Sequence, residues 1–328
     1  DRDTLSDCAC AMVDADESQA VINPTAKQRE AFRSTGKQRK DAIARACDRA
    51  REPAVTASGK QIAVLANVGD VEDTRVAVEN GADGVGLYRL EQTYLGRQKP
   101  PSTTQLLVEM QHTLQPAEGL PVYVRLLDVG ADKPLPFVEM PREGNPSLGQ
   151  RGIRFLWKYP ELLHTQLDAL IQLSLDHDLH ILVPMVTLPR DMRAVKEALG
   201  EAAARARTSD LPKLGAMIET PAAALAASEM LKHSDFLSFG TNDLTQYIFA
   251  ADRENTAVDS YFDDTHDIIF ELISMVHGDV PDAPLSVCGE LAGRAGATSR
   301  LVECGITSLS VVPPSIPAVK EAVRNCGR

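Results

Sequence analysis

A cysteine near the C-terminal end of the chain stands where a thiol could take part in chemistry. In the segment SVCGELAG (286–293), Cys288 follows a short apolar run and precedes Gly289, so it lies where a strand is expected to end and a loop to begin. A cysteine that only fills space belongs in the middle of such a run, although free cysteines are often simply buried. Cys288 is therefore a candidate for proton transfer, and the purely structural interpretation stays open.

Arginines stand at or shortly after the predicted ends of several apolar segments. Each of them alone could be an ordinary surface charge. Guanidinium groups that are brought to one site repel one another unless an anion joins them, and their planar forks match the oxygens of a phosphate. The arginines concerned are Arg89, Arg125, Arg151, Arg154 and Arg253.

Two carboxylates end neighbouring apolar segments, Glu219 in LGAMIE (214–219) and Asp243 just after FLSFGT (236–241). They suit a Mg²⁺ ion that also takes water and substrate oxygens. Arginines and Mg²⁺ together predict a phosphoryl-bearing substrate and phosphoryl transfer. No His–Asp pair accompanies Cys288 in the sequence around it, and a thiol beside a bound phosphate is not helped to ionise. The pattern therefore favours a neutral S–H that acts as a general acid.

Eight short apolar segments separated by helical stretches must position these residues. Continuous apolar strands between helices are typical of a parallel sheet that is covered on both faces. Eight of them within residues 61–328 predict an α/β fold of the (β/α)₈ TIM-barrel type, in which the strand ends meet at one rim. The alternative, a doubly wound sheet, would normally show a Gly-rich turn after its first strand, and ANVGD (66–70) is too short for one. The predicted strands are 61–68, 84–89, 122–128, 180–186, 214–219, 236–241, 285–290 and 308–313.

A basic segment precedes the predicted barrel. Residues 27–52 carry nine Lys/Arg against four Asp/Glu, and Thr25 is placed to cap a helix that is expected to be interrupted at STG (34–36). The segment is either a solvated helix face or a linker helix that contacts another domain. The chain opens with DRDTLSDCAC and has no initial methionine, so we expect it to be part of a longer protein.

Composition excludes several classes of function. The formal net charge of −12 argues against nucleic acid as the main partner. No apolar run approaches the roughly 18 residues of a membrane span, so no membrane partner is expected. The six cysteines form no CxxC pair, which argues against a zinc site and against a disulfide framework and indicates a reducing, cytoplasmic location.

Seven segments together resemble the phosphoenolpyruvate-binding barrel of the Enzyme I family, the phosphoenolpyruvate–protein phosphotransferases of the bacterial sugar phosphotransferase system. The resemblance covers roughly residues 12–328, and the segments follow the family's order and spacing. They are GADGVGLYRLEQTYL (81–95), VRLLDVGADKPLP (124–136), NPSLGQRGIR (145–154), MIETPAAAL (217–225), FGTNDLTQY (239–247), AADREN (250–255) and CGELAG (288–293).

The resemblance implies a role for each candidate residue. Glu219 and Asp243 match the Mg²⁺ ligands of the family. Cys288 matches the acid that protonates the methylene carbon of enolpyruvate as the phosphoryl group departs. The residues that match the substrate-binding positions, mainly around the phosphate, are Arg89, Arg125, Arg151, Asn242 and Arg253.

The sequence departs from the family in three respects. Leu90 stands where the family usually has threonine, which we expect to cost a hydroxyl contact near the site, and Ala131 stands where it has glycine. None of the seven histidines lies in the Gly-rich TSH context of the family's phosphohistidine. We therefore interpret residues 1–25 as the tail of a missing phosphohistidine domain, 26–60 as a linker helix and 61–328 as the barrel.

The resemblance also implies partners. The chain is expected to bind phosphoenolpyruvate (PEP) and release pyruvate, but not to complete turnover alone, because the phosphoryl group passes to a histidine of a separate or missing domain. A histidine-containing phosphocarrier protein would follow, and a homodimer is implied. The alternatives are the barrel of a pyruvate phosphate dikinase or PEP synthase and a PEP-sensing dimerisation module; the sequence does not choose between the sugar-transport, nitrogen-regulatory and multidomain branches.

Overall fold

The computed structural model describes residues 10–14, 19–130, 135–140 and 142–327. These residues form two compact units, Asp1–Arg49 and Ala50–Arg328, which we treat separately. Within the described ranges, no helix is both long enough and apolar enough to cross a membrane.

The first unit contains a small hairpin and one long helix. Strands β1 (Ala11–Asp14) and β2 (Gln19–Ile22) pair antiparallel. Helix α2 (Ala26–Asp48) begins with a capping box, in which the Thr25 hydroxyl accepts the Gln28 N–H and the Gln28 side chain accepts the Thr25 N–H. The expected interruption at residues 34–36 is wrong, because α2 runs through Gly36 without a break. A glycine inside a helix costs only about 1 kcal/mol, which its neighbours can offset.

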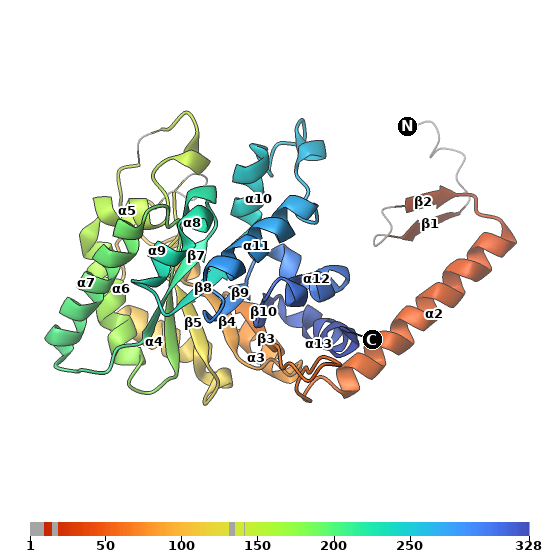
Figure 1. Ribbon diagram of the computed structural model, residues 1–328, viewed down its shortest axis with the longest axis horizontal. Helices are drawn as coiled ribbons and strands as arrows, with labels where there is room; N and C mark the ends of the chain where they lie inside the picture. Colours follow the sequence, from red (N-terminus) through yellow and green to blue (C-terminus); the bar gives the residue numbers. More distant parts are fainter. Residues whose placement is uncertain (1–9, 15–18, 131–134, 141, 328) are drawn as a thin grey trace. The chain divides into compact units, whose positions relative to one another are not determined.

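The second unit is a closed barrel of eight parallel strands in chain order, in which β10 pairs with β3 (Figure 1). The predicted fold class is confirmed, and the doubly wound alternative is wrong. Every predicted strand is present, although most are shorter than expected. The strands are β3 (Ala63–Val68), β4 (Val85–Arg89), β5 (Val122–Arg125), β6 (Leu179–Val183), β7 (Lys213–Ile218), β8 (Phe236–Phe239), β9 (Leu285–Val287) and β10 (Ser308–Val311).

Helices connect the strands and surround the barrel (Figure 1). The main hydrophobic core contains buried strand residues such as Val64 and Ile181 together with helix residues such as Leu106 and Leu163. The helices are α3 (Val71–Glu79), α4 (Thr103–Leu114), α5 (Ile153–Lys158), α6 (Pro160–Leu173), α7 (Pro189–Ala206), α8 (Pro221–Leu225), α9 (Ala227–Leu231), α10 (Thr241–Phe249), α11 (Asp267–Asp279), α12 (Thr298–Glu303) and α13 (Ile316–Asn325).

A second, smaller cluster of buried side chains fills the inside of the barrel. Because successive strand residues face opposite sides, residues that do not join the main core face the barrel axis. The ring of Phe236 has room there because residue 215 is a glycine: a Cβ at Gly215 would lie 2.2 Å from the ring. The cluster closes the barrel below its C-terminal rim, so chemistry is confined to that rim. Its members are Leu87, Leu182, Met217, Phe236 and Cys288.

Candidate active site

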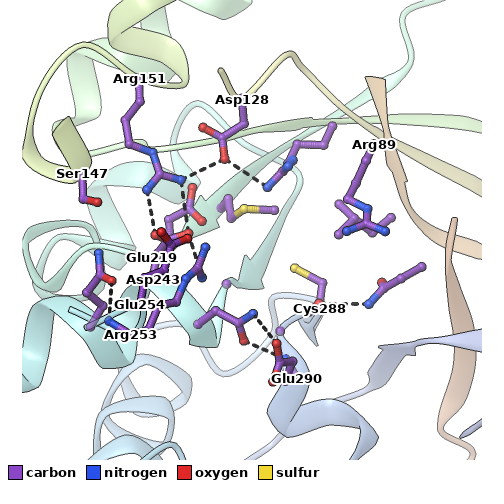
Figure 2. Close-up of a pocket in the computed structure, with 18 of the residues that line it drawn as sticks. Arg89, Asp128, Ser147, Arg151, Glu219, Asp243, Arg253, Glu254, Cys288 and Glu290 are labelled. Atoms are coloured by element: carbon purple, nitrogen blue, oxygen red, sulfur yellow. Dashed lines mark hydrogen bonds and ion pairs between the residues drawn. The ribbon is translucent and has the colours of Figure 1, made fainter. Parts of the chain in front are cut away.

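A cavity of about 690 Å³ opens at the carboxyl ends of the strands (Figure 2). It brings together the eight residues to which the resemblance assigns a role. They come from five different strand ends and from the loops that follow, so only the closed barrel makes them neighbours. The eight are Arg89, Arg125, Arg151, Glu219, Asn242, Asp243, Arg253 and Cys288.

Two glycines let the segments after β7, β8 and β9 approach one another at the cavity wall. A Cβ at Gly240 would lie 2.7 Å from Glu219 Oε2, and a Cβ at Gly289 would lie 2.1 Å from Thr241 Oγ1. The second contact involves the N-terminal residue of α10, whose next two residues are Asn242 and Asp243. The glycines therefore allow the carboxylates and the amide to reach one cavity.

Ion pairs connect the arginines and carboxylates in an alternating series (Figure 2). Arg125 lies 2.6 Å from Glu91 and 3.2 Å from Asp128. Arg151 lies 3.0 Å from Asp128 and 2.8 Å from Asp243. Burial by itself would lower the pKa of both guanidinium groups, but the surrounding carboxylates outweigh it and raise both pKa values. Both arginines therefore stay charged inside the protein.

Two further arginines are held less tightly. Arg253 lies 3.8 Å from Asp243, and its backbone N–H donates to Gln246 Oε1. Arg89 pairs in register with Arg125 at the end of β4, and no carboxylate among the described residues forms an ion pair with it. Arg89 is exposed at the cavity and is a cation that is available to an incoming anion.

Glu219 is the most buried carboxylate of the site, at 1% exposure. Its Oε1 accepts the backbone N–H of Met185, whose φ of 56° lies in the left-handed region. Burial and, to a smaller extent, the nearby carboxylates of Asp243 and Asp128 together raise the pKa of Glu219 to about 8, against the opposing effect of Arg151. The carboxylates thus repel one another, and a cation between them would relieve this repulsion.

The carboxylate oxygens of Glu219 and Asp243 are suitable ligands for a Mg²⁺ ion. The described residues contain no cluster of three or more His, Cys, Asp or Glu that could hold a metal by themselves. Mg²⁺, however, is commonly bound by one or two carboxylates, with water and substrate phosphates completing its shell. Two hard oxygen donors beside arginines that could hold a phosphate match this requirement.

The thiol of Cys288 lies in the same cavity, apart from the side chains of Arg151, Asp128 and Asp243 (Figure 2). It is 6% exposed, and its Sγ contacts Ser238 Oγ at 3.4 Å and the Phe239 carbonyl oxygen at 3.5 Å. The pKa of this thiol is raised to about 11, mainly by burial and also by Glu219, although the Ser238 hydrogen bond and Arg125 act to lower it. The group is consequently a neutral S–H at neutral pH.

We expect Cys288 to react with iodoacetamide very slowly at neutral pH, because the thiolate is the nucleophile. The rate should rise with pH toward a midpoint near 11, where burial places the pKa of the thiol. Peptide mass spectrometry of the Cys288 peptide measures the rate at each pH and separates it from the other cysteines. Rapid alkylation with a midpoint below about 9 would contradict this environment.

The site also contains residues that the sequence analysis did not assign to it. Glu91 holds Arg125 and left no signal in the sequence. Asp128, which holds Arg125 and Arg151, is the last residue of the predicted strand 122–128 and belongs with the polar strand-end residues that the sequence offers. Asn67 donates from its side chain to the Cys288 carbonyl oxygen, and Ser147 and Gln246 also line the cavity. A single polar residue in or after an apolar strand is too common to reveal such roles.

Other predicted neighbours lie elsewhere. Arg154 does not line the cavity, and its guanidinium donates to the Leu148 carbonyl oxygen and to Thr187 Oγ1. Leu90 is fully buried in the main core, so a hydroxyl at this position would face the core rather than the cavity. Ala131 lies outside the described residues.

Comparison with known proteins shows to which family the chain belongs. The family described as PEP-utilising enzyme, PEP-binding domain, matches residues 44–328. A phosphoenolpyruvate-protein phosphotransferase of Haloferax volcanii is 36% identical over 332 residues, which cover 98% of this chain and 57% of that protein. One from Buchnera aphidicola subsp. Acyrthosiphon pisum is 34% identical, with 95% and 56% covered. A multiphosphoryl transfer protein of Xanthomonas campestris pv. campestris is 36% identical, with 98% and 38% covered.

The chain spans about half the length of the phosphotransferases that it matches. The family match includes the whole barrel and every residue that lines the cavity. The chain therefore belongs to the PEP-utilising enzymes, whose PEP-binding domain it contains.

Proposed function

We propose that this chain is the PEP-binding catalytic part of a phosphoenolpyruvate–protein phosphotransferase of the Enzyme I type. The observation that carries the proposal is the meeting of four arginines, two carboxylates and a protonated thiol in one cavity. The phosphoryl group of PEP passes to a histidine of a separate or missing domain, and pyruvate is released. The names of the relatives support this direction of transfer.

The arginines bind the phosphate end of PEP. Arg89 is free of ion pairs among the described residues and accepts the anion first, together with Arg253 and the amide of Asn242. Arg125 and Arg151 are already oriented by carboxylates, so they offer fixed guanidinium groups to the substrate. Preorganised cations of this kind stabilise the charge that develops on a transferring phosphoryl group.

Glu219 and Asp243 would hold a Mg²⁺ ion beside the phosphate. The ion, when bound, neutralises charge on the phosphoryl group and the enolate oxygen. The two side chains bring their oxygens to the cavity from the ends of β7 and β8, and Arg151 keeps Asp243 oriented. The buried Glu219 is fixed by the N–H of Met185.

Cys288 acts at the carbon end of the substrate. As the phosphoryl group leaves, the S–H bond breaks and a C–H bond forms at the methylene carbon of enolpyruvate, which gives pyruvate and a thiolate. A proton from water then restores the thiol. A thiol that stays protonated at neutral pH is suited to this task, because it always carries the proton that must be delivered.

The remaining assignments of the sequence analysis belong to the same proposal. Residues 1–25 are the tail of a phosphohistidine domain, residues 26–60 a linker helix and residues 61–328 the PEP-binding barrel. The protein acts in the cytoplasm as a homodimer and passes its phosphoryl group on to a histidine-containing phosphocarrier protein. The support for these points is the likeness to phosphotransferases of about twice this length.

Calorimetry of PEP binding tests the proposal directly. The chain should bind PEP in the presence of Mg²⁺ and much more weakly without it, because two carboxylates alone repel the substrate. Asp243→Asn keeps the shape of the side chain and should lose the Mg²⁺-dependent part of binding. Asp168→Asn is the matched control, since Asp168 pairs with Arg205 on the surface and does not line the cavity. Absence of PEP binding with and without Mg²⁺ would refute the assignment.

A further inference from the structure

Ser238 contacts the Cys288 thiol and has no part in the function proposed above. It lies on β8, beside β9, and its hydroxyl donates a hydrogen bond to Cys288 Sγ over 3.4 Å. The residue is 3% exposed and does not line the cavity, so its hydroxyl can influence a substrate only through the thiol. A buried hydroxyl needs a hydrogen-bonding partner, and the thiol supplies one.

The thiol is held in one orientation by several contacts. Its Sγ accepts a hydrogen bond from the Ser238 hydroxyl, and its S–H donates to the Phe239 carbonyl oxygen at 3.5 Å. The two hydrogen bonds together fix the direction of the S–H bond. The backbone carbonyl of Cys288 accepts from the Asn67 side chain at 3.2 Å, and Asn67 in turn accepts from Ser310 at 2.6 Å. Strands β3, β8 and β10 therefore all contribute to the position of Cys288.

We propose that Ser238 is a positioning residue for Cys288, whose hydroxyl orients the thiol and stabilises the thiolate left after proton delivery. This inference rests on the proposed function, in which Cys288 gives its proton to the methylene carbon. When the S–H bond breaks, negative charge moves from the enolate to sulfur, and the Ser238 O–H already points at that sulfur. A hydrogen bond to a charged group is roughly twice as strong as one between neutral groups, so Ser238 favours the thiolate over the thiol.

The charged groups around the thiol act independently of Ser238. Glu219 at the end of β7 disfavours the thiolate, and Arg125 at the end of β5 favours it. Arg89 from β4 and Glu290 from the 3-10 helix after β9 line the same cavity. A substitution at position 238 leaves all four side chains in place, so its effect reports on the hydroxyl.

Alkylation of Cys288 as a function of pH tests the proposal. Ser238→Ala should move the midpoint of the rate profile upward by about one pH unit, because the thiolate loses its donor. Ser238→Thr retains a hydroxyl and should keep the midpoint close to that of the parent chain. Ser234→Ala is the control, since it removes a buried hydroxyl that donates to the Met230 carbonyl oxygen, away from Cys288. A Ser238→Ala profile that coincides with the parent profile overturns the proposal.

A second measurement separates this inference from the proposed function. Exchange of the methyl protons of pyruvate with D₂O, followed by NMR in the presence of Mg²⁺, reports proton transfer at the substrate carbon. If Cys288→Ala exchanges as fast as the parent chain, the proton donor of the proposed function is wrong, while alkylation still decides the role of Ser238. If Cys288→Ala is slow, Ser238→Ala should be about tenfold slower than the parent with an unchanged pyruvate affinity. An unchanged rate would then overturn the Ser238 proposal.

Discussion

Arg125→Ala should unfold at a much lower denaturant concentration than the parent chain and should lose PEP binding. The Arg125 guanidinium bridges the carboxylates of Glu91 and Asp128, and all three side chains are at most 11% exposed. Removal of one partner from a buried ion pair leaves an uncompensated charge and typically costs about 3–5 kcal/mol. Equilibrium denaturation gives the free energy of unfolding, and calorimetry gives the PEP affinity.

Arg205→Ala is the matched control for this prediction. Arg205 pairs with Asp168 at 2.7 Å, but its side chain is 46% exposed, so the loss should stay below about 1 kcal/mol. A similar small loss in Arg125→Ala would mean that the buried carboxylates find other partners. The ion-pair series would then not be the element that holds the site together.

Cys288→Ala should lose the exchange of pyruvate methyl protons while it still binds PEP. A general acid or base typically contributes about 10²–10⁴-fold to a rate, and the thiol is the proton carrier in the proposed mechanism. The arginines and carboxylates of the cavity are untouched, so the PEP affinity should remain that of the parent chain. NMR in D₂O gives the exchange rate, and calorimetry gives the affinity.

Cys304→Ala is the control that isolates this effect. Cys304 is half-buried, its thiol contacts the Phe270 carbonyl oxygen, and it does not line the cavity. Its removal should leave exchange unchanged. If Cys288→Ala exchanges pyruvate protons as fast as Cys304→Ala, Cys288 has only a structural role, as a small side chain packed inside the barrel.

The order of elements could be predicted from the sequence because it depends on local pattern. Apolar runs such as QIAVLANV (61–68) and HILVPMV (180–186) are too short for helices and are separated by amphipathic stretches, which favours a parallel sheet. The residues at which the strands end were predicted less accurately than the order of the elements. The run VYVRLLD (122–128) continues past Arg125 in composition, but β5 ends at Arg125, after which the Leu126 N–H still bonds to the neighbouring strand, at Leu182.

The sequence alone also predicted that the polar residues at the strand ends share one site. A barrel of parallel strands brings all of its carboxyl ends to one side, so the positions of Arg89, Glu219, Asp243 and Cys288 at strand ends already predicted one common site.

Only the tertiary structure decided which of these groups contact one another. The distances between Arg125 and Glu91, or between Cys288 and Ser238, depend on strand register and side-chain direction across neighbouring strands. Both are set by packing around the whole barrel and leave no local pattern in the sequence. The same applies to Leu90, which is buried in the core one residue after Arg89 reaches the cavity: β4 ends at Arg89, and a 3-10 helix begins at Leu90.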